Sequence, residues 1–163
     1  MPDPEHSVVT IRSAVVTDVT VLCDIARTAK AGWPYPAEWL ESWRDALTIT
    51  EADLERWRVR VAETVELPGS GVVGFCAVSL GAPHWTVEHL WVSPSAERRG
   101  AGRALMADAI AAARAAGIAA LELDADPHAE PFYLRLGGQR IASTPAPMPG
   151  APERVLPRIR LET

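Results

Sequence analysis

A short glycine-containing loop between an apolar run and an alanine-rich helix constrains the fold most. Residues 85–92 are apolar enough for a strand, the loop contains Gly100 and Gly102, and helical periodicity runs from about Arg103 to Ala116. A loop of small residues at a helix start leaves backbone N–H groups unpaired, and the helix dipole adds partial positive charge there. Such a position favours phosphate groups, so the sequence predicts a site for a phosphorylated cofactor.

A strand follows this helix at residues 118–124, which makes a strand–helix–strand unit. Two strands joined in this way lie parallel with a right-handed crossover. The other segments predict antiparallel strands and flanking helices. We expect an α/β (α+β) fold with a mixed, mostly antiparallel sheet and one central parallel strand pair. The remaining elements are strands at 8–12, 58–63, 72–80, 139–142 and 155–161, helices at 17–31, 37–47, 50–57 and 129–136, and a hairpin turn at 67–71.

Length and composition limit the class of protein. A chain of 163 residues can form one full core, so we expect a single domain over 1–163. The net charge of −5 argues against nucleic acid, which needs a concentrated basic surface. No apolar run approaches the roughly 20 residues that span a bilayer, and the N-terminal residues show no signal-peptide pattern. Two distant cysteines indicate reduced thiols without metal-ligand spacing. We expect a cytoplasmic protein, with monomer and homodimer both left open.

Two common phosphate-binding loops do not match the glycine loop. A P-loop has Lys followed by Ser or Thr at the helix start, where this chain has Arg103 and Ala104. A dinucleotide fingerprint needs a third glycine, which Leu105 replaces, although Glu122 and Asp124 lie at about the distance of its acidic residue. The several antiparallel elements before the loop also differ from a Rossmann half. A third kind of phosphate site is therefore needed.

Two ordered motifs resemble those of the GNAT N-acetyltransferase superfamily. Residues 99–104 read R-x-x-G-x-A, preceded by Val92-x-Pro94, and resemble the acyl-CoA-binding motif (Q/R)-x-x-G-x-(G/A). Residues 129–137 read A-x-x-F-Y-x-x-x-G and resemble the later A-x-x-(aromatic or Leu)-Y-x-x-x-G segment. The expected element order also agrees over residues 8–161. The resemblance therefore covers nearly the whole chain.

This resemblance implies acetyl-CoA as co-substrate. The backbone amides of the glycine loop would hold its pyrophosphate, with the arginine side chains adding positive charge. The backbone of the preceding strand would pair with pantetheine, and one of its N–H groups would form an oxyanion hole. The implied cofactor-binding residues are Leu90, Trp91, Val92, Arg99, Gly100, Ala101, Gly102, Arg103 and Ala104.

Two side chains are candidates for proton transfer. By resemblance, Tyr133 would protonate the leaving thiolate as general acid, and the alternative is a packing aromatic. Glu88 is an acid within an apolar strand, where an unpaired carboxylate needs a cavity or a partner. We expect it to share a strand face with Leu90 and to act as general base, while a solvated or salt-bridged strand acid is the alternative. His84 and His89 are further candidates for the base.

An aromatic cluster surrounds the first two helices. The resemblance implies that this region walls the acceptor pocket, so Trp33 and Tyr35 are expected substrate-contacting residues, with core packing as the alternative. We expect transfer of an acetyl group to a primary amine of a small molecule or peptide, by direct attack. The alternatives are a non-catalytic acyl-CoA-binding sensor or partner-binding module, and a nucleotide-binding α/β domain.

Overall fold

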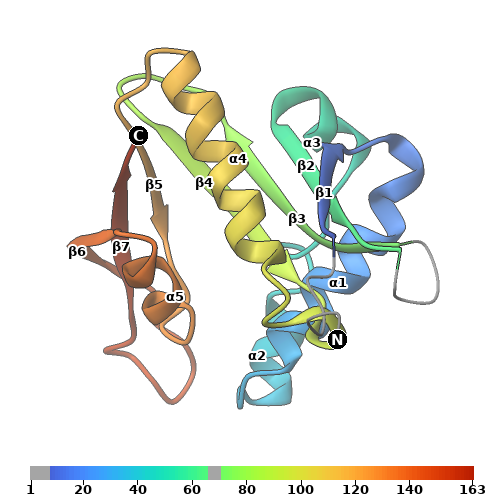
Figure 1. Cartoon of the computed structure of the whole chain (residues 1–163). Helices are drawn as coiled ribbons and strands as arrows, with labels where there is room; N and C mark the ends of the chain where they lie inside the picture. The colour runs from blue at the N-terminus through green and yellow to red at the C-terminus, as the bar shows by residue number, and fades with distance from the viewer. Residues whose placement is uncertain (1–7, 66–70) are drawn as a thin grey trace, which may run out of the picture.

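The fold is built on one seven-stranded sheet. The computed structural model describes residues 8–65 and 71–163, and its strands follow the order β1-β2-β3-β4-β5-β7-β6 (Figure 1). Neighbouring strands are antiparallel except for the central pair β4 and β5, which confirms the predicted mixed sheet. The strands are β1 (Thr10–Ser13), β2 (Arg58–Glu63), β3 (Val72–Ser79), β4 (Trp85–Val92), β5 (Ala120–Asp124), β6 (Gln139–Pro145) and β7 (Val155–Glu162).

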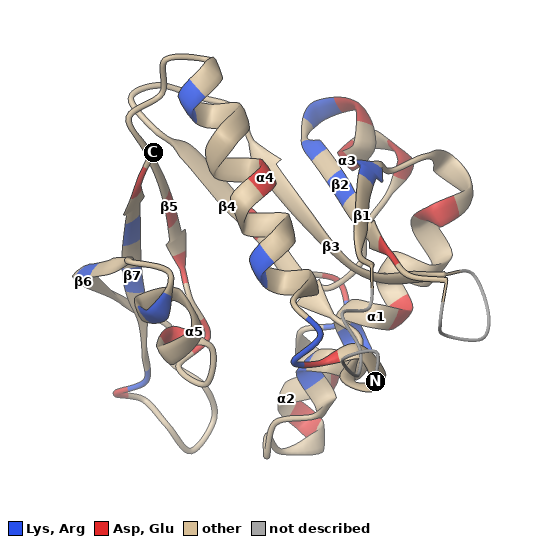
Figure 2. Ribbon diagram, viewed as in Figure 1, with Lys and Arg blue, Asp and Glu red and all other residues tan. Residues whose placement is uncertain are grey.

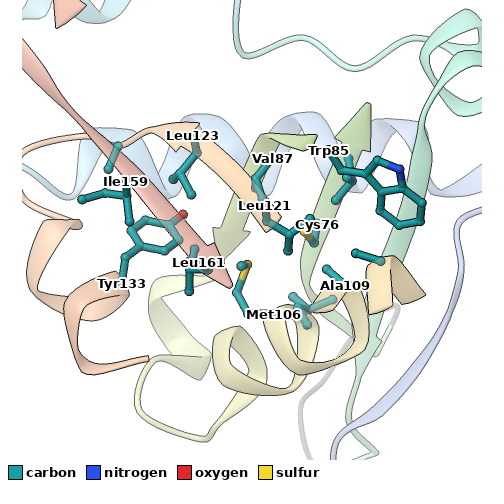
Figure 3. Packing of buried hydrophobic residues seen from close by; sticks show 14 of the residues in the cluster. Cys76, Trp85, Val87, Met106, Ala109, Leu121, Leu123, Tyr133, Ile159 and Leu161 are labelled. Carbon is teal, nitrogen blue, oxygen red and sulfur yellow. The ribbon is translucent and has the colours of Figure 1, made fainter. Parts of the chain in front are cut away.

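Helices cover both faces of the sheet and form two cores. One core packs α4 and the start of α5 against the sheet around Leu105, Met106 and Leu121 (Figure 3). The other packs α1 around Leu22 and Phe75. The α-helices of the described residues are α1 (Val19–Ala31), α2 (Ala37–Ser42), α3 (Glu51–Arg56), α4 (Ala101–Ala115) and α5 (Glu130–Arg135), and short 3-10 turns span Val16–Asp18 and Pro94–Ala96. No helix in residues 8–65 and 71–163 has the length and apolar character needed to cross a membrane.

Local signals predicted most element boundaries to within two residues, with two clear differences. Strand β6 runs to Pro145, three residues beyond the strand predicted over 139–142. The capping box at Thr50 forms as predicted, because its side chain and that of Asp53 exchange hydrogen bonds with each other's backbone. The helix predicted over 37–47 is shorter, because α2 ends at Ser42. The Ser42 hydroxyl donates to the Trp39 carbonyl at 2.7 Å, a local bond that competes with helix propagation. The hairpin turn predicted at 67–71 lies almost entirely outside the described residues.

The central strands β4 and β5 pair over only two positions and then diverge. Trp85 pairs with Leu121 and Thr86 with Glu122, and no later pair forms between these two strands in the described chain. From Val87 onward, the edge of β4 that faces β5 is therefore without a strand partner. We call the paired part the closed end and the part formed by residues 87–92 and 123–126 the open end.

Candidate active site

The loop predicted to hold phosphate forms an open helix N-terminus. Helix α4 begins after Gly100, whose φ of 83° is left-handed, and has neither a side-chain cap nor an acidic residue in its first turn. The first backbone bond back to this loop runs from the Ala104 N–H to the Gly100 carbonyl at 2.9 Å. The N–H groups of residues 101–103 consequently have no partner within the helix. Basic positions occupy the loop leading into α4 (Figure 2), so this arrangement can hold a diphosphate.

The two glycines of this loop are needed for different reasons. Gly100 takes a positive φ that side-chain-bearing residues rarely adopt. Gly102 instead gives space, because a Cβ there would lie 3.3 Å from the ring of Phe132 and 3.6 Å from Val92. The second motif therefore packs directly against the first, through Phe132. This contact explains in physical terms why the two motifs occur together.

Three cavities lie in a row along the diverging strands. The first, which we call the cradle-side cavity because it borders the glycine loop at the start of α4, has a volume of about 210 Å³ and is lined by Gly102, Phe132 and Tyr133 among others. A cavity of about 70 Å³ shares Leu90, Trp91 and Tyr133 with it. The third, about 280 Å³, shares Glu88 and Trp91 with the middle one. The small middle cavity thus lies between the cradle-side cavity and the third cavity.

Tyr133 lies at the junction of the first two cavities. It is 5% exposed and packs among Leu123, Ile159 and Leu161 (Figure 3). Its ring therefore does pack in the core, while the residue also lines both cavities. Burial raises the pKa of Tyr133 well above its usual range, so the phenol keeps its proton at neutral pH. A protonated phenol at this position can donate to a leaving group.

Glu88 lies in a β-bulge, which changes the face that sequence alternation assigned to it. Ala77 pairs with His89 and Val78 with Val87, so Glu88 has no opposite residue on β3. The extra residue reverses the alternation, and Val87 and Leu90 both pack on the α4 side. The expectation that Glu88 shares a regular strand face with Leu90 is therefore wrong. Its carboxylate is exposed, accepts from Ser79 Oγ at 2.6 Å, and lines the middle and third cavities.

The two histidines considered as bases have different surroundings. His89 lines the middle and third cavities, but burial lowers its pKa and its Nδ1 accepts a hydrogen bond from Trp91 Nε1 at 3.2 Å. Its neutral ring therefore carries the proton on Nε2 and has no free acceptor there. His84 lies instead at the closed end, 3.5 Å from Glu122. Of the three candidate bases, Glu88 is the one that lines the cavities with an exposed side chain.

A buried ion pair spans the open end of the strand pair. Lys30 Nζ lies 2.6 Å from Asp126 Oδ2, and the Tyr35 hydroxyl lies 2.8 Å from both carboxylate oxygens. Although burial opposes ionisation, the bonds from Lys30, the His128 N–H and Tyr35 hold the pKa of Asp126 below its ordinary value. Burial lowers the pKa of Lys30, whose ammonium lies 4.2 Å from the Trp43 ring centroid. The carboxylate of Asp126 is thus occupied within the protein.

The structure separates the two aromatic residues expected at the acceptor site. Trp33 lines the cradle-side and middle cavities and stacks on His128 at 5.4 Å between ring centroids. Tyr35 lines none of the three cavities and instead supports Asp126. Burial and the neighbouring Asp126 carboxylate raise the pKa of Tyr35 to about 12, so it donates this bond throughout the neutral range. The aromatic side chains that line the third cavity are Trp43 and Trp91.

Sequence reasoning missed two charged residues of the third cavity. Lys30 continues the apolar stripe of α1 four residues after Ala26. A charged residue on a buried helix face is a sequence signal that could have marked Lys30 as a site residue. Arg154 lies in a proline-rich loop between β6 and β7 that carries no such pattern. Its place in the site follows from tertiary packing alone.

Solved structures that share this fold include N-acetyltransferases. The chain is similar to the PaiA N-acetyltransferase of Thermoplasma acidophilum in complex with coenzyme A, with 18% identity, coverage of 96% and 99% of the two chains, and a TM-score of 0.72. It is also similar to the ribosomal-protein-S18-alanine N-acetyltransferase of Escherichia coli, with 21% identity, coverage of 95% and 94%, and a TM-score of 0.67. A third similar structure is a GCN5-related N-acetyltransferase of Rhodopseudomonas palustris, with 22% identity, coverage of 94% of each chain, and a TM-score of 0.73. The fold is therefore one that N-acetyltransferases share.

A family model identifies the chain more closely. The model described as the Acetyltransferase (GNAT) family matches residues 22–138. The chain therefore belongs to the GNAT acetyltransferase family. Its co-substrate is acetyl-CoA, and its chemistry is acetyl transfer. No curated protein matches the chain in a sequence comparison.

Proposed function

We propose that this protein transfers the acetyl group of acetyl-CoA to a primary amine by direct attack. The observation that carries the proposal is the row of cavities along the diverging strands. Tyr133 stands where the cradle-side cavity meets the middle cavity, and Glu88 stands where the middle cavity meets the third. The proposed acid and the proposed base therefore lie on opposite sides of one narrow passage. Bringing two reactants together there can supply much of the rate.

Each end of the site has a distinct task. The unpaired amides of residues 101–103 would hold the pyrophosphate. The unpaired edge of β4 at residues 90–92 would bind pantetheine and offer an N–H to the carbonyl oxygen. Acetyl-CoA supplies the thioester whose carbon bonds to the amine nitrogen as the C–S bond breaks. Glu88 takes the proton that turns the ammonium group into a neutral amine, and the nitrogen loses its second proton to solvent as the amide forms. Tyr133 gives its proton to the departing sulfur. Solvent then restores both residues to their starting protonation states.

Direct attack is supported by the position of the cysteines. Cys76 is 1% exposed, and burial raises its pKa to about 12, so its thiol is neither ionised nor reachable. Cys23 belongs to α1 and is buried against Ile49, with its sulfur 3.3 Å from the Ile49 carbonyl oxygen. Neither residue lines any of the three cavities. A thiolate nucleophile is therefore not supplied by these residues, and an acetyl-cysteine step is not part of the proposal.

The test of this proposal is Tyr133→Phe, measured by thiol release from acetyl-CoA with a panel of amines. Loss of a general acid should lower kcat about 100-fold, while the Kd for acetyl-CoA stays within about twofold by calorimetry. Removing one hydroxyl leaves the ring in place, so the unfolding midpoint should change little. Unchanged kcat in Tyr133→Phe would show that Tyr133 is only a packing aromatic.

Glu88→Gln tests the proposed role of Glu88 as general base. It should lower kcat/KM most at low pH, where the amine is most fully protonated and a base is most needed. Glu55→Gln, an exposed acid on α3, is the matched control and should leave the rate unchanged. Binding of acetyl-CoA with no turnover on any amine would instead favour the non-catalytic sensor.

A further inference from the structure

The third cavity contains more charged groups than acetyl transfer to a simple amine requires. Its lining includes Lys30, Glu88, Asp124, Asp126 and Arg154, together with an aromatic and aliphatic wall. General acid–base chemistry uses at most one of these groups. The others must either pair with one another or face the acceptor.

Most of these charges are paired within the protein. Lys30 and Asp126 form the ion pair that spans the open end. Asp124 accepts from Thr144 Oγ1 at 2.7 Å and lies 3.3 Å from Arg158. The remaining two, Glu88 and Arg154, have no oppositely charged side chain within 4.0 Å in the part of the chain that the structure describes. The cavity thus presents one unneutralised anion and one unneutralised cation.

Arg154 is held in a defined position rather than loose in solvent. Its Nη1 donates to the Ala146 carbonyl at 3.3 Å, and its own carbonyl accepts from the Ala146 N–H at 2.9 Å. The guanidinium carbon lies 5.2 Å from the ring centroid of Trp43 and 5.8 Å from those of Tyr35 and Trp39. It also lies beside the Tyr35 hydroxyl. A guanidinium fixed against aromatic rings keeps further N–H groups in one plane, and a planar carboxylate matches them.

We propose that the acceptor is a small amine that carries a carboxylate, with its amino group at Glu88 and its carboxylate at Arg154. This inference rests on the proposed function and names the substrate class of the same site. A cavity of about 280 Å³ is at the small end for ligand pockets, which suits an amino acid rather than a folded protein surface. Trp43, Leu47 and Leu156 provide the apolar wall along which the carbon chain of the acceptor lies. Diamines are disfavoured, because their second ammonium group would meet Arg154.

The experiment compares acceptors that differ only in the carboxylate. Thiol release from acetyl-CoA is measured with glycine, β-alanine, 4-aminobutyrate, 6-aminohexanoate and L-phenylalanine, each beside its amide, and with putrescine. The intrinsic reactivity of an amine differs between acid and amide, so the readout is how the acid-to-amide ratio of kcat/KM changes between wild type and Arg154→Gln. This double ratio cancels the reactivity of the amine itself. The chain length that gives the largest ratio reports the span between the two charged groups.

We expect Arg154→Gln to lower the acid-to-amide ratio at least tenfold for the best acceptor, with Arg154→Lys in between. Arg154→Glu should shift the preference toward putrescine. Arg114→Gln, an exposed arginine in the last turn of α4, should leave the ratio unchanged. Calorimetry with acetyl-CoA shows whether each variant is folded and competent. A ratio that Arg154→Gln does not alter, in a variant that binds acetyl-CoA normally, overturns the inference.

The failures of the two proposals are distinguishable. If the wild type acetylates amides and putrescine as well as acids, direct acetyl transfer stands and the carboxylate inference falls. If it binds acetyl-CoA and acetylates none of these amines, the carboxylate-bearing class is again excluded. If it shows no heat with acetyl-CoA, the proposed function itself fails.

Discussion

The closed and open ends of the β4–β5 pair each contain a buried carboxylate, and they neutralise it differently. At the closed end, Glu122 is 8% exposed and receives bonds from Arg158 and Arg160, both at 3.0 Å. These arginines keep 24% and 33% of their side chains exposed. At the open end, the Lys30 and Asp126 side chains are only 11% and 7% exposed. The cations reach water at one end and are enclosed at the other.

This difference shows what holds the site open. At the closed end, backbone pairing already joins the strands, and the alternating acidic and basic positions of β5 and β7 add ion pairs at the sheet surface (Figure 2). At the open end no strand pairing crosses the gap, and the Lys30–Asp126 pair ties α1 to the segment after β5 instead. A buried pair gains little over an apolar contact, but removing one partner leaves an uncompensated charge. We therefore expect removal of one charged partner to destabilise the protein more at the open end than at the closed end.

The largest effect is expected for Asp126→Asn. This change leaves the Lys30 ammonium enclosed without a carboxylate, which should cost about 3 kcal/mol in the free energy of unfolding. Urea unfolding of the apo protein measures this loss. Lys30→Met should restore part of the stability in the Asp126→Asn background, because it removes the stranded charge. A loss that is additive over the two changes would show that the pair is not coupled.

A smaller effect is expected for Glu122→Gln at the closed end. Both arginines can turn to solvent, and Arg158 keeps Asp124 as a partner at 3.3 Å. The loss should be about 1.5 kcal/mol, at the low end for hydrogen bonds to a charged acceptor, because both arginines remain partly in water. The same urea experiment reports it, alongside acetyl-transfer activity, which should be retained. If Glu122→Gln destabilises more than Asp126→Asn, the contrast between the two ends is reversed.

Asp126 at the open end should also determine part of how steeply the free energy of unfolding falls at acid pH. Burial by itself would raise the pKa of Asp126, but the bond and charge of Lys30, together with the bonds from the His128 N–H and Tyr35, lower this pKa in the folded state. A carboxyl with a lowered folded pKa stabilises the protein above its unfolded pKa of about 4, and this stability is lost as pH falls through the folded pKa. Asp126→Asn should make stability less steeply pH-dependent below about pH 4, by up to about 1.4 kcal/mol per pH unit. Identical slopes for wild type and variant would contradict this.

The smallest effect is expected for His84→Asn. His84 lies 3.5 Å from Glu122, which keeps both arginines when the imidazole is removed. A partly exposed charge contact of this kind is worth less than about 0.5 kcal/mol. The unfolding midpoint and the acetyl-transfer rate should both match the wild type. A marked loss of activity would place His84 in the chemistry after all.

Much of the fold and half of the candidate site could be predicted because their signals are local. The capping box at Thr50, the glycine loop and the segment around Tyr133 each depend on residues within a few positions of one another. Interactions between residues so close in the sequence form largely independently of the rest of the fold. Even here local alternation failed at Glu88, because the bulge on β4 depends on its register with β3.

The sequence by itself determined the element order, the helix start that suits a diphosphate, and the family. Only the tertiary structure decided how Lys30 meets Asp126, 96 positions away, and how Arg154 comes to lie against Trp43. The reason is that charge pairing inside a cavity depends on which distant elements pack together. No periodicity within a single helix or strand encodes that choice.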